Sequence, residues 1–349
     1  MVPDGGRASR PASAANLPPL AASSRGERAP GGADVIRQTR WPGRAAGGRR
    51  GSAVQAASGG TAERWIEDNL DMGPVVKSSL VGSSGWSSQY IYETDSGVKL
   101  FVKTSRGSDE GMFKGEALGL QAMYDTHTMR IPKVYHFGVL PANGGSFIVM
   151  EHLNFSGRAS HEELGRRLAQ MHLAEPQDDK ARKGLFGFPV DNTIGGTPQP
   201  NGWMDNWVDF FRERRLRHQL ELAGDGRLMQ MGERLMASLE TFFDGVSVKP
   251  SVLHGDLWSG NIAAVDGEPS IFDPAVYYGH HEAEFGMSWC AGFSAAFWKA
   301  YHDIIPRSPG FEERKKIYLL YHYLNHYNLF GSGYYGECQS LLSQLTRKL

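Results

Sequence analysis

Between residues 75 and 150 the chain consists of short runs rich in Val, Ile, Tyr and Phe, separated by residues that favour turns. Such runs of β-branched and aromatic residues predict strands. One segment differs, because Met112–Tyr124 places its apolar residues at the spacing of an amphipathic helix. The predicted order is therefore three strands, a helix and two strands. The predicted strands are Val75–Val81, Gln89–Glu93, Val98–Lys103, Lys133–Val139 and Ser146–Met150, with turns at Thr94–Gly97 and Pro141–Gly145.

Beyond Glu151 the pattern becomes mainly helical. The stretch Ser160–Glu163 matches a capping box, in which a serine and a glutamate three residues later satisfy the first N–H groups of a helix. The apolar residues that follow, Leu164, Leu168 and Met171, share one helical face. The boundary between a β-rich part and a helical part is therefore expected near residues 151–159.

A Gly- and Pro-rich loop, Gly184–Gly202, leads into another predicted helix. The aromatic residues of this helix are expected on one side, where they pack in the core rather than form a ligand platform. They are Trp203, Trp207, Phe210 and Phe211. Two short apolar runs follow, Val252–Leu253 and Ser270–Phe272, and each ends in a cluster of polar residues.

Composition divides the chain at about residue 60. The first 60 residues contain 9 Arg, no Lys and 3 acidic residues, and Ala, Gly, Ser, Pro and Arg make up 45 of them. Such a stretch cannot bury a core. Its composition is typical of an organelle transit peptide, and it lacks the apolar region of a secretory signal. We expect residues 1–60 to be a disordered transit peptide; a disordered tail and a misassigned start codon are the alternatives.

The net charge of −1 hides this division. Nine of the 37 basic and three of the 38 acidic residues lie in the first 60, so the other 289 residues carry 28 basic and 35 acidic residues. This acidic excess argues against a nucleic-acid partner. No apolar run approaches the roughly 18 to 20 residues of a membrane-spanning helix. Cys290 and Cys338 are too few for a disulfide framework, and we expect two inert, buried thiols.

Candidate chemistry is concentrated in the segment His254–Asn261, which reads HGDLWSGN. Asn261 follows Asp256 by five residues, and Asp273 follows Asn261 by twelve. This spacing is typical of a phosphotransferase. One carboxylate orients and accepts the proton of an attacking hydroxyl, while an amide oxygen and a second carboxylate hold Mg²⁺. Oxygen ligands suit this hard cation. The sequence therefore predicts phosphoryl transfer from ATP with Asp256 as base and Asn261 and Asp273 as metal ligands.

A kinase of this kind also pairs a lysine with an acid to hold the nucleotide phosphates. Lys103 ends the third predicted strand, and Glu116 lies 13 residues further on, in the predicted helix. Small residues between the first two strands would let backbone N–H groups approach a polyphosphate. The end of the fifth strand would form an adenine-binding hinge. The residues expected at these two places are Gly82, Ser83, Ser84 and Gly85 in the loop and Met150, Glu151, His152 and Leu153 in the hinge.

His322 and His326 are four residues apart and would share one face of a helix, which is metal-ligand spacing. No glutamate stands at the position between them that a zinc protease uses, and no third ligand is evident nearby. We therefore expect buried histidines that form local hydrogen bonds, in a helix ended by Gly331–Gly333.

Several stretches together resemble the fructosamine/ketosamine 3-kinase family, in particular its plant, plastid-targeted members. The resemblance covers about residues 63–346. Its most specific parts are Gly115–Leu120, His254–Asn261, Phe272–Ala275, Tyr278–His280 and Tyr321–His326. It implies an α+β, protein-kinase-like fold with two lobes. Residues 61–150 would form a small β-rich, ATP-binding lobe with one helix, and residues 151–349 a large, mainly helical lobe with the catalytic loop, metal ligands and sugar site.

The implied reaction is phosphorylation by ATP, with Mg²⁺, of the 3-hydroxyl of a ketosamine, either free or on a glycated protein. The 3-phosphate is labile, so the amine is regenerated and the protein is repaired. Trp258 is similar to a residue that lines the family's sugar pocket. Ribulosamines and erythrulosamines are the expected substrates, with fructosamine as a further candidate, and the chloroplast is the expected location rather than the mitochondrion or cytosol. Some members carry a redox-sensitive Cys in the glycine-rich loop, but Gly82–Ser88 has none.

Two alternatives use the same motifs differently. A choline or aminoglycoside phosphotransferase would share the catalytic loop, and an acidic aminoglycoside pocket could use Glu282 and Glu284. The ordinary interpretation of these two acids is a helix N-terminus enriched in negative charge. A pseudokinase that only binds a partner would lack one of Lys103, Asp256, Asn261 or Asp273, and all four are present.

Overall fold

The structure is a computed structural model that describes residues 62–106, 111–140 and 145–347. The predicted transit peptide, residues 1–60, lies outside these ranges, as do residues 141–144 of the predicted turn at 141–145. Within the described ranges, no helix has both the length and the apolar character needed to cross a membrane.

A five-stranded antiparallel sheet forms the first lobe, with the strands in the order β1-β2-β3-β5-β4. The predicted strands are all present, with ends shifted by one or two residues. Their bounds are β1 Val75–Ser83, β2 Ser88–Thr94, β3 Lys99–Ser105, β4 Val134–Val139 and β5 Ser146–Glu151. The predicted helix is α2, Gly111–Tyr124. A further helix, residues 62–69, was not predicted.

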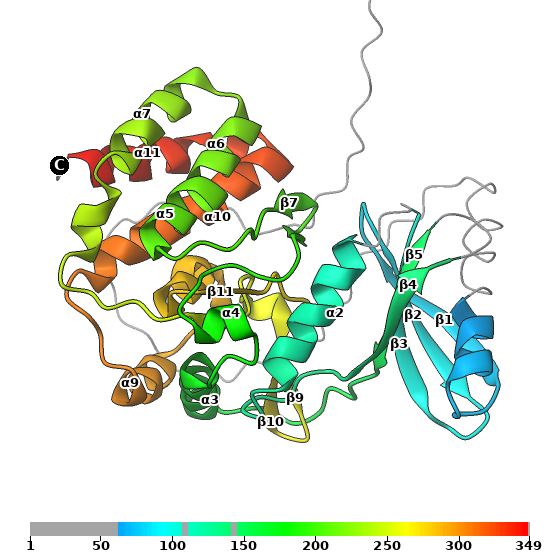
Figure 1. Cartoon of the computed structure of the whole chain (residues 1–349). Coiled ribbons are helices and arrows are strands. Elements are labelled where there is room, and N and C mark those ends of the chain that lie inside the picture. Colours follow the sequence, from blue (N-terminus) through cyan, green and yellow to red (C-terminus); the bar gives the residue numbers. More distant parts are fainter. Residues whose placement is uncertain (1–61, 107–110, 141–144, 348–349) are drawn as a thin grey trace, which may run out of the picture.

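The two faces of the sheet contact different cores because alternate residues of a strand point to opposite sides. On one face Val102 and Val149 pack with Ile66 of the helix at 62–69. On the other face Ile148 and Met150 pack with Leu120 of α2. Helix α2 therefore joins the sheet to the large core of the second lobe, and Figure 1 shows it between the sheet and the helical lobe.

The second lobe is mainly helical. Its longer helices are α3 His161–Leu173, α7 Gly226–Met236, α9 Ala295–Ile304, α10 Phe311–Phe330 and α11 Tyr335–Thr346. Its short helical segments are α4 Asp179–Arg182, α5 Trp207–Phe211, η1 Arg212–Arg217, α6 His218–Ala223, η2 Leu239–Phe243, η3 Ser259–Asn261, η4 His281–Met287, α8 Ser288–Ala291 and η5 Ser332–Tyr334. Its strands form the pairs β6 Asn192–Ile194 with β7 Thr197–Gln199, β8 Ser251–Leu253 with β11 Tyr277–Gly279, and β9 Ile262–Val265 with β10 Glu268–Ile271.

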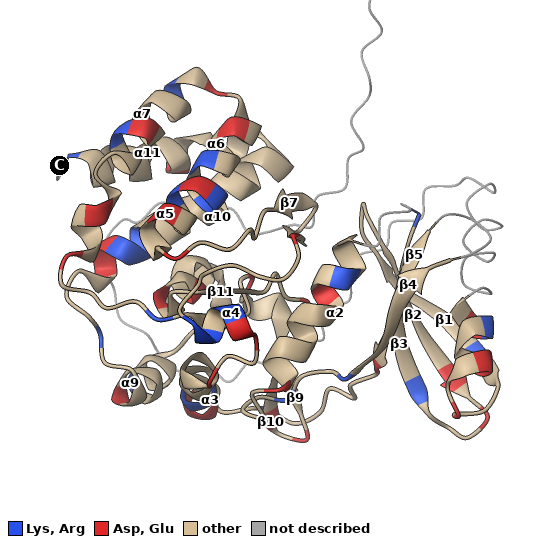
Figure 2. Cartoon of the chain, viewed as in Figure 1, with Lys and Arg blue, Asp and Glu red and all other residues tan. Residues whose placement is uncertain are grey.

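Local sequence signals set several of these ends. Ser160 caps α3 as predicted, since its hydroxyl accepts a hydrogen bond from the Glu163 N–H at 3.0 Å. Gly331 follows the last residue of α10, as predicted. Acidic and basic residues are interspersed along the helices of this lobe (Figure 2).

Two details of the sequence interpretation are wrong. Trp203 precedes helix α5 rather than belonging to it, and its ring stacks on Tyr278 with centroids 6.1 Å apart. The predicted loop Gly184–Gly202 contains the β6–β7 hairpin. These strands are three residues long and have no alternating pattern that a sequence reading could detect.

Candidate active site

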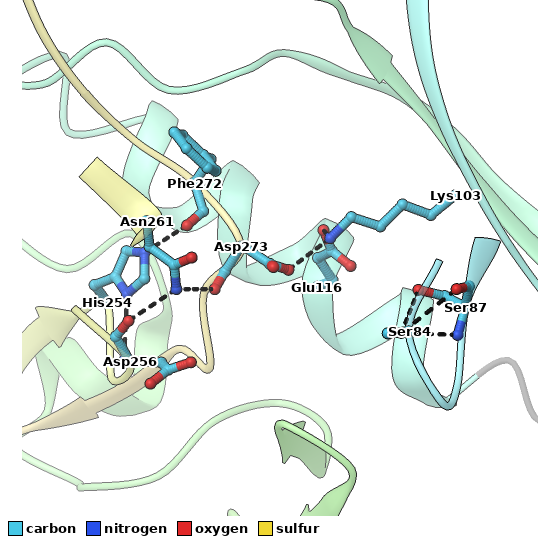
Figure 3. Close-up of polar contacts among 9 residues, drawn as sticks. All are labelled: Ser84, Ser87, Lys103, Glu116, His254, Asp256, Asn261, Phe272 and Asp273. Carbon is cyan, nitrogen blue, oxygen red and sulfur yellow. Dashed lines mark hydrogen bonds and ion pairs between the residues drawn. The ribbon is translucent and has the colours of Figure 1, made fainter. Parts of the chain in front are cut away.

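Lys103 lies inside β3 with its ammonium group between two carboxylates. Its Nζ atom is 2.7 Å from Oε1 of Glu116 in α2 and 2.5 Å from Oδ1 of Asp273 (Figure 3). The residue is only 7% exposed. Burial by itself would lower the pKa of Lys103, but the Asp273 and Glu116 carboxylates outweigh it and raise the pKa. Lys103 is therefore a fixed cation where the sheet, α2 and the segment after β10 meet.

His254 links the backbone at Asp256 to the backbone just before Asp273. Its Nδ1 atom is 3.2 Å from the Asp256 N–H nitrogen, and its Nε2 atom is 2.9 Å from the Phe272 carbonyl oxygen. Because Nδ1 accepts, Nε2 must carry the proton and donate it to Phe272. Burial lowers the pKa of His254, which keeps the ring neutral in this role. The preceding strand β8 ends at Leu253, so the loop begins directly at this histidine.

Gly255 is required by close packing between the two loops of the site. Its φ is +79°, and a Cβ placed there would lie 2.2 Å from the carbonyl oxygen of Ala275. No other residue could bring these backbones so close.

Asn261 joins the loop of Asp256 to the loop of Asp273. Its Nδ2 atom donates to the Asp256 carbonyl oxygen at 2.9 Å and to the Asp273 carbonyl oxygen at 3.2 Å (Figure 3). Since the amide nitrogen is engaged on both sides, the position of the amide oxygen is also fixed. Asn261 is buried, whereas the side chain of Asp273 is 52% exposed.

Asp273 adopts a left-handed backbone conformation, with φ +59°. Asp is one of the few residues other than Gly that enters this region readily, and such strained positions are common at functional sites. Burial would raise the pKa of Asp273, but the neighbouring Lys103 ammonium group lowers it. Its carboxylate is therefore ionised and available.

Asp256 has the opposite electrostatic environment. Burial, with added repulsion from the Asp273 and Glu284 carboxylates, raises the pKa of Asp256 to about 7. A carboxyl group with a pKa near the working pH is suited to accept a proton during a reaction.

Glu284 is a site residue that the sequence interpretation missed. It is buried in η4 and accepts hydrogen bonds from the His254 N–H at 2.7 Å and the Gly255 N–H at 3.0 Å. His172 of α3 lies 3.3 Å from the same carboxylate and 2.7 Å from the Tyr301 hydroxyl. Glu284 thus supports the start of the loop His254–Asn261. In the sequence, only the position of Glu284 after the loop of Asp273 could have indicated that it supports residues 254 and 255. A position alone is a weak signal.

Glu282 and Glu284 lie in the first turn of η4, as the interpretation of a helix N-terminus enriched in acids predicts. Both are buried, and Glu282 makes two 2.7 Å contacts with the guanidinium group of Arg314 in α10. These contacts occupy both Glu282 oxygens. Glu282 forms the one compact group of potential metal ligands among the described residues with His280 and His281, but Arg314 engages its carboxylate, and burial lowers the pKa of both histidines.

The remaining predicted site residues lie around this centre. Gly82 and Ser83 belong to β1 and pair with Gln89 and Ser88, so the loop is shorter than predicted and consists of residues 84–87. Met150 and Glu151 end β5, and His152 and Leu153 follow it. The Glu151 carboxylate forms an ion pair with Arg130. Trp258 precedes η3, and its ring lies over Gly260. A Cβ added to Gly260 would lie 2.3 Å from Cη2 of this ring.

The other candidates fit structural roles. His322 and His326 are both buried in α10, where burial lowers their pKa values to about 3 and about 4. They are therefore neutral, and they are not part of the metal-ligand group found among the described residues. Cys290 and Cys338 are free thiols, and burial raises both pKa values to about 12. The half-buried Cys290 is less enclosed than predicted.

Comparison with known proteins agrees with this geometry. The sequence profile described as fructosamine kinase matches residues 61–348. The chain is 49% identical over 292 residues to the chloroplastic protein-ribulosamine 3-kinase of Oryza sativa subsp. indica, covering 82% of this chain and 83% of that protein. It is 37% identical over 310 residues to the ketosamine-3-kinase of Mus musculus, covering 82% of this chain and 100% of that protein.

A solved structure shows the same architecture. The crystal structure of a candidate fructosamine-3-kinase from Haemophilus somnus 129PT superposes with a TM-score of 0.72 at 25% sequence identity. The match covers 83% of this chain and 98% of that one. The predicted two-lobe, α+β fold class is confirmed.

Proposed function

Because the chain belongs to the fructosamine kinase family, we propose that it transfers the terminal phosphoryl group of ATP to the 3-hydroxyl of a ketosamine. The observation that carries this proposal is the convergence of Lys103, Asp256, Asn261 and Asp273 at one place, linked by the contacts described above. These side chains come from β3 and from the loops after β8 and β10. Relatives named protein-ribulosamine 3-kinase and ketosamine-3-kinase support the same substrate class.

In this proposal Asp256 orients the sugar hydroxyl and accepts its proton as the new bond to phosphorus forms. Lys103, held by Glu116, binds the nucleotide phosphates. Residues 61–150 form the ATP-binding lobe and residues 151–349 carry the acceptor site. The end of β1 at Gly82 and Ser83, together with Ser84 and Gly85 of the loop that follows, covers the phosphates. The hinge of Met150, Glu151, His152 and Leu153 contacts adenine.

The residues present fit a bound magnesium ion. Two acids, Glu116 and Asp273, contact the ammonium group of Lys103, and repulsion from the Asp273 and Glu284 carboxylates contributes to the raised pKa of Asp256. A cation beside Asp273 would relieve this excess of negative charge. The fixed amide oxygen of Asn261 and the half-exposed carboxylate of Asp273 are the ligand types that Mg²⁺ prefers. When bound, the ion neutralises charge on the phosphates during transfer.

For the acceptor we propose ribulosamines and erythrulosamines, free or on glycated proteins, with release of the labile 3-phosphate and repair of the amine. Trp258 follows the base by two residues, and its ring offers an apolar surface for the C–H face of a sugar. We also propose that residues 1–60 direct the chain to the plastid. The chloroplastic location in the name of the Oryza relative supports this.

Phosphorylation of an acceptor panel tests the proposed function. The full-length protein with ATP and Mg²⁺ is expected to phosphorylate ribuloselysine and erythruloselysine, and fructoselysine more slowly. Removal of divalent cations with EDTA should stop turnover, and added Mg²⁺ should restore it. The measurement is ADP release together with identification of the phosphorylated sugar carbon.

Choline and an aminoglycoside serve as the matched alternative acceptors. Preferred turnover of either would assign the chain to another small-molecule kinase on the same scaffold. Nucleotide binding without turnover of any acceptor would instead support a binding module.

The activity is expected to depend on the protonation of Asp256. Its pKa is raised to about 7, so lowering the pH protonates the base and should lower kcat/KM. The neighbouring His254 has a lowered pKa and stays neutral, so it should not contribute to the fall of kcat/KM at low pH. A pH profile of kcat/KM for the acceptor checks this. A rate that stays constant from about pH 5.5 to 8.5 would argue against Asp256 as the base.

A further inference from the structure

Trp86 stands at the tip of the loop between β1 and β2, and the residue is 44% exposed. The loop is closed by its own hydrogen bonds. The Ser84 N–H donates to the Ser87 carbonyl oxygen at 2.7 Å, and the Ser87 N–H donates to the Ser84 hydroxyl at 3.1 Å (Figure 3). The backbone that carries Trp86 therefore has a defined shape, and the indole extends from it instead of folding into the first lobe.

The indole of Trp86 packs on the second lobe, at the turn between β6 and β7. A Cβ added to Gly196 would lie 3.1 Å from Cε3 and 3.2 Å from Cζ3 of Trp86, so the ring lies directly against the glycine backbone. On the neighbouring residue, a Cβ added to Gly195 would lie 3.0 Å from Cδ1 of Leu329 in α10. The turn therefore contacts the loop of the first lobe at Gly196 and a helix of the second lobe at Gly195.

The β6–β7 hairpin is anchored to the segment that follows Asp273. Asn192 Nδ2 donates to the Val276 carbonyl oxygen at 2.8 Å, and Gln199 Nε2 donates to the Ala275 carbonyl oxygen at 3.1 Å. Through this hairpin, the position of Trp86 is tied to the segment that begins with a proposed magnesium ligand.

We propose that Trp86 is a positioning residue that holds the glycine-rich loop in its closed position through contact with Gly196. This inference rests on the proposed function, since closure matters only if the loop covers nucleotide phosphates. Without the contact the loop has more conformations available, and nucleotide binding must select the closed one. The apparent affinity then falls in proportion to the closed fraction.

The nucleotide affinities of the wild type and four variants test this role. Calorimetric titration of the full chain with a non-hydrolysable ATP analogue and Mg²⁺ is expected to give a Kd for Trp86→Ala about three- to tenfold above that of the wild type, the range typical of one lost contact. Trp86→Phe should recover part of this loss. Gly196→Val should also raise the Kd, because its side chain would displace the indole. Gly226→Val, at an exposed glycine with no atom within 4 Å of its added Cβ, is the matched control.

The decisive measurement is the double variant Trp86→Ala with Gly196→Val. If the two residues act through their contact, the valine should have little further effect once the indole is absent. An equal effect of Gly196→Val in both backgrounds, or an unchanged Kd for Trp86→Ala, would overturn the inference. Failure of the wild-type protein to bind the nucleotide would instead count against the proposed function. In Trp86→Ala the KM for ATP should rise by a larger factor than kcat falls. General destabilisation of the protein would not produce this difference.

Discussion

Replacing Asp256 by asparagine is expected to lower kcat by about 100- to 10,000-fold, the usual cost of losing a general base. Asparagine keeps the size of the side chain and can still orient a hydroxyl, but it cannot accept its proton. The surrounding loop should persist, since His254 and Asn261 contact the backbone of residue 256 rather than its carboxylate. Initial rates with ribuloselysine at saturating ATP measure the effect.

Two controls separate chemistry from folding in this variant. Nucleotide affinity should change much less than kcat, because Lys103, Glu116 and Asp273 are untouched. Asp256→Glu keeps a carboxyl group but displaces it, and we expect intermediate activity. Turnover of Asp256→Asn within about threefold of wild type would remove Asp256 from the proposed mechanism.

The same substitution has an expected effect on stability. The pKa of an aspartate in an unfolded chain is about 4, whereas burial and two neighbouring carboxylates raise the pKa of Asp256 to about 7 in the folded protein. The folded protein therefore retains this proton at pH values where the unfolded chain has lost it. The contribution of Asp256 to stability is present at low pH and is lost as the pH rises toward 7. The Tm of Asp256→Asn minus the Tm of the wild type should therefore increase as the pH rises from about 4 to about 7.

Except for the helix at residues 62–69, the first lobe could be predicted from sequence because its strands and α2 carry their own local signals. The β3 run ends in Lys103-Thr104-Ser105, and α2 has apolar residues at helical spacing, so strand, helix and the Lys103–Glu116 pair were all deducible. The motif from His254 to Asn261 was equally clear, since its chemistry depends on residues close together in the chain.

The missed features depend on contacts between distant segments. Glu284 supports the catalytic loop from 28 positions beyond Asp256, and Trp86 meets Gly196 across the two lobes. Neither residue has a neighbouring pattern that indicates its partner. Burial is a further such feature, because the sequence places Glu282 near a helix N-terminus but does not indicate that the residue is only 1% exposed in the fold.

The buried pair of Glu282 and Arg314 leads to the second large expected effect. Arg314 is fully buried and also donates to the carbonyl oxygens of Phe242 and Pro309. Replacing Glu282 by glutamine leaves this guanidinium group without a counter-charge, and a guanidinium cannot release its proton to become neutral. We expect the free energy of unfolding to fall by about 3–5 kcal/mol, the range measured when one partner of a buried pair is removed.

Substitution of both partners distinguishes an uncompensated charge from lost packing. The double variant Glu282→Leu with Arg314→Met removes both charges, so it should be more stable than Glu282→Gln. Asp303→Asn, which breaks the exposed pair with Lys299 in α9, is the surface control and should change stability little. Urea unfolding of the four proteins followed by circular dichroism gives the comparison. If Glu282→Gln behaves like the surface control, the bidentate contact contributes no net stability. If instead the double variant is the least stable, the two charges are required together, and the pair holds η4, and with it Glu284, in place beneath the catalytic loop.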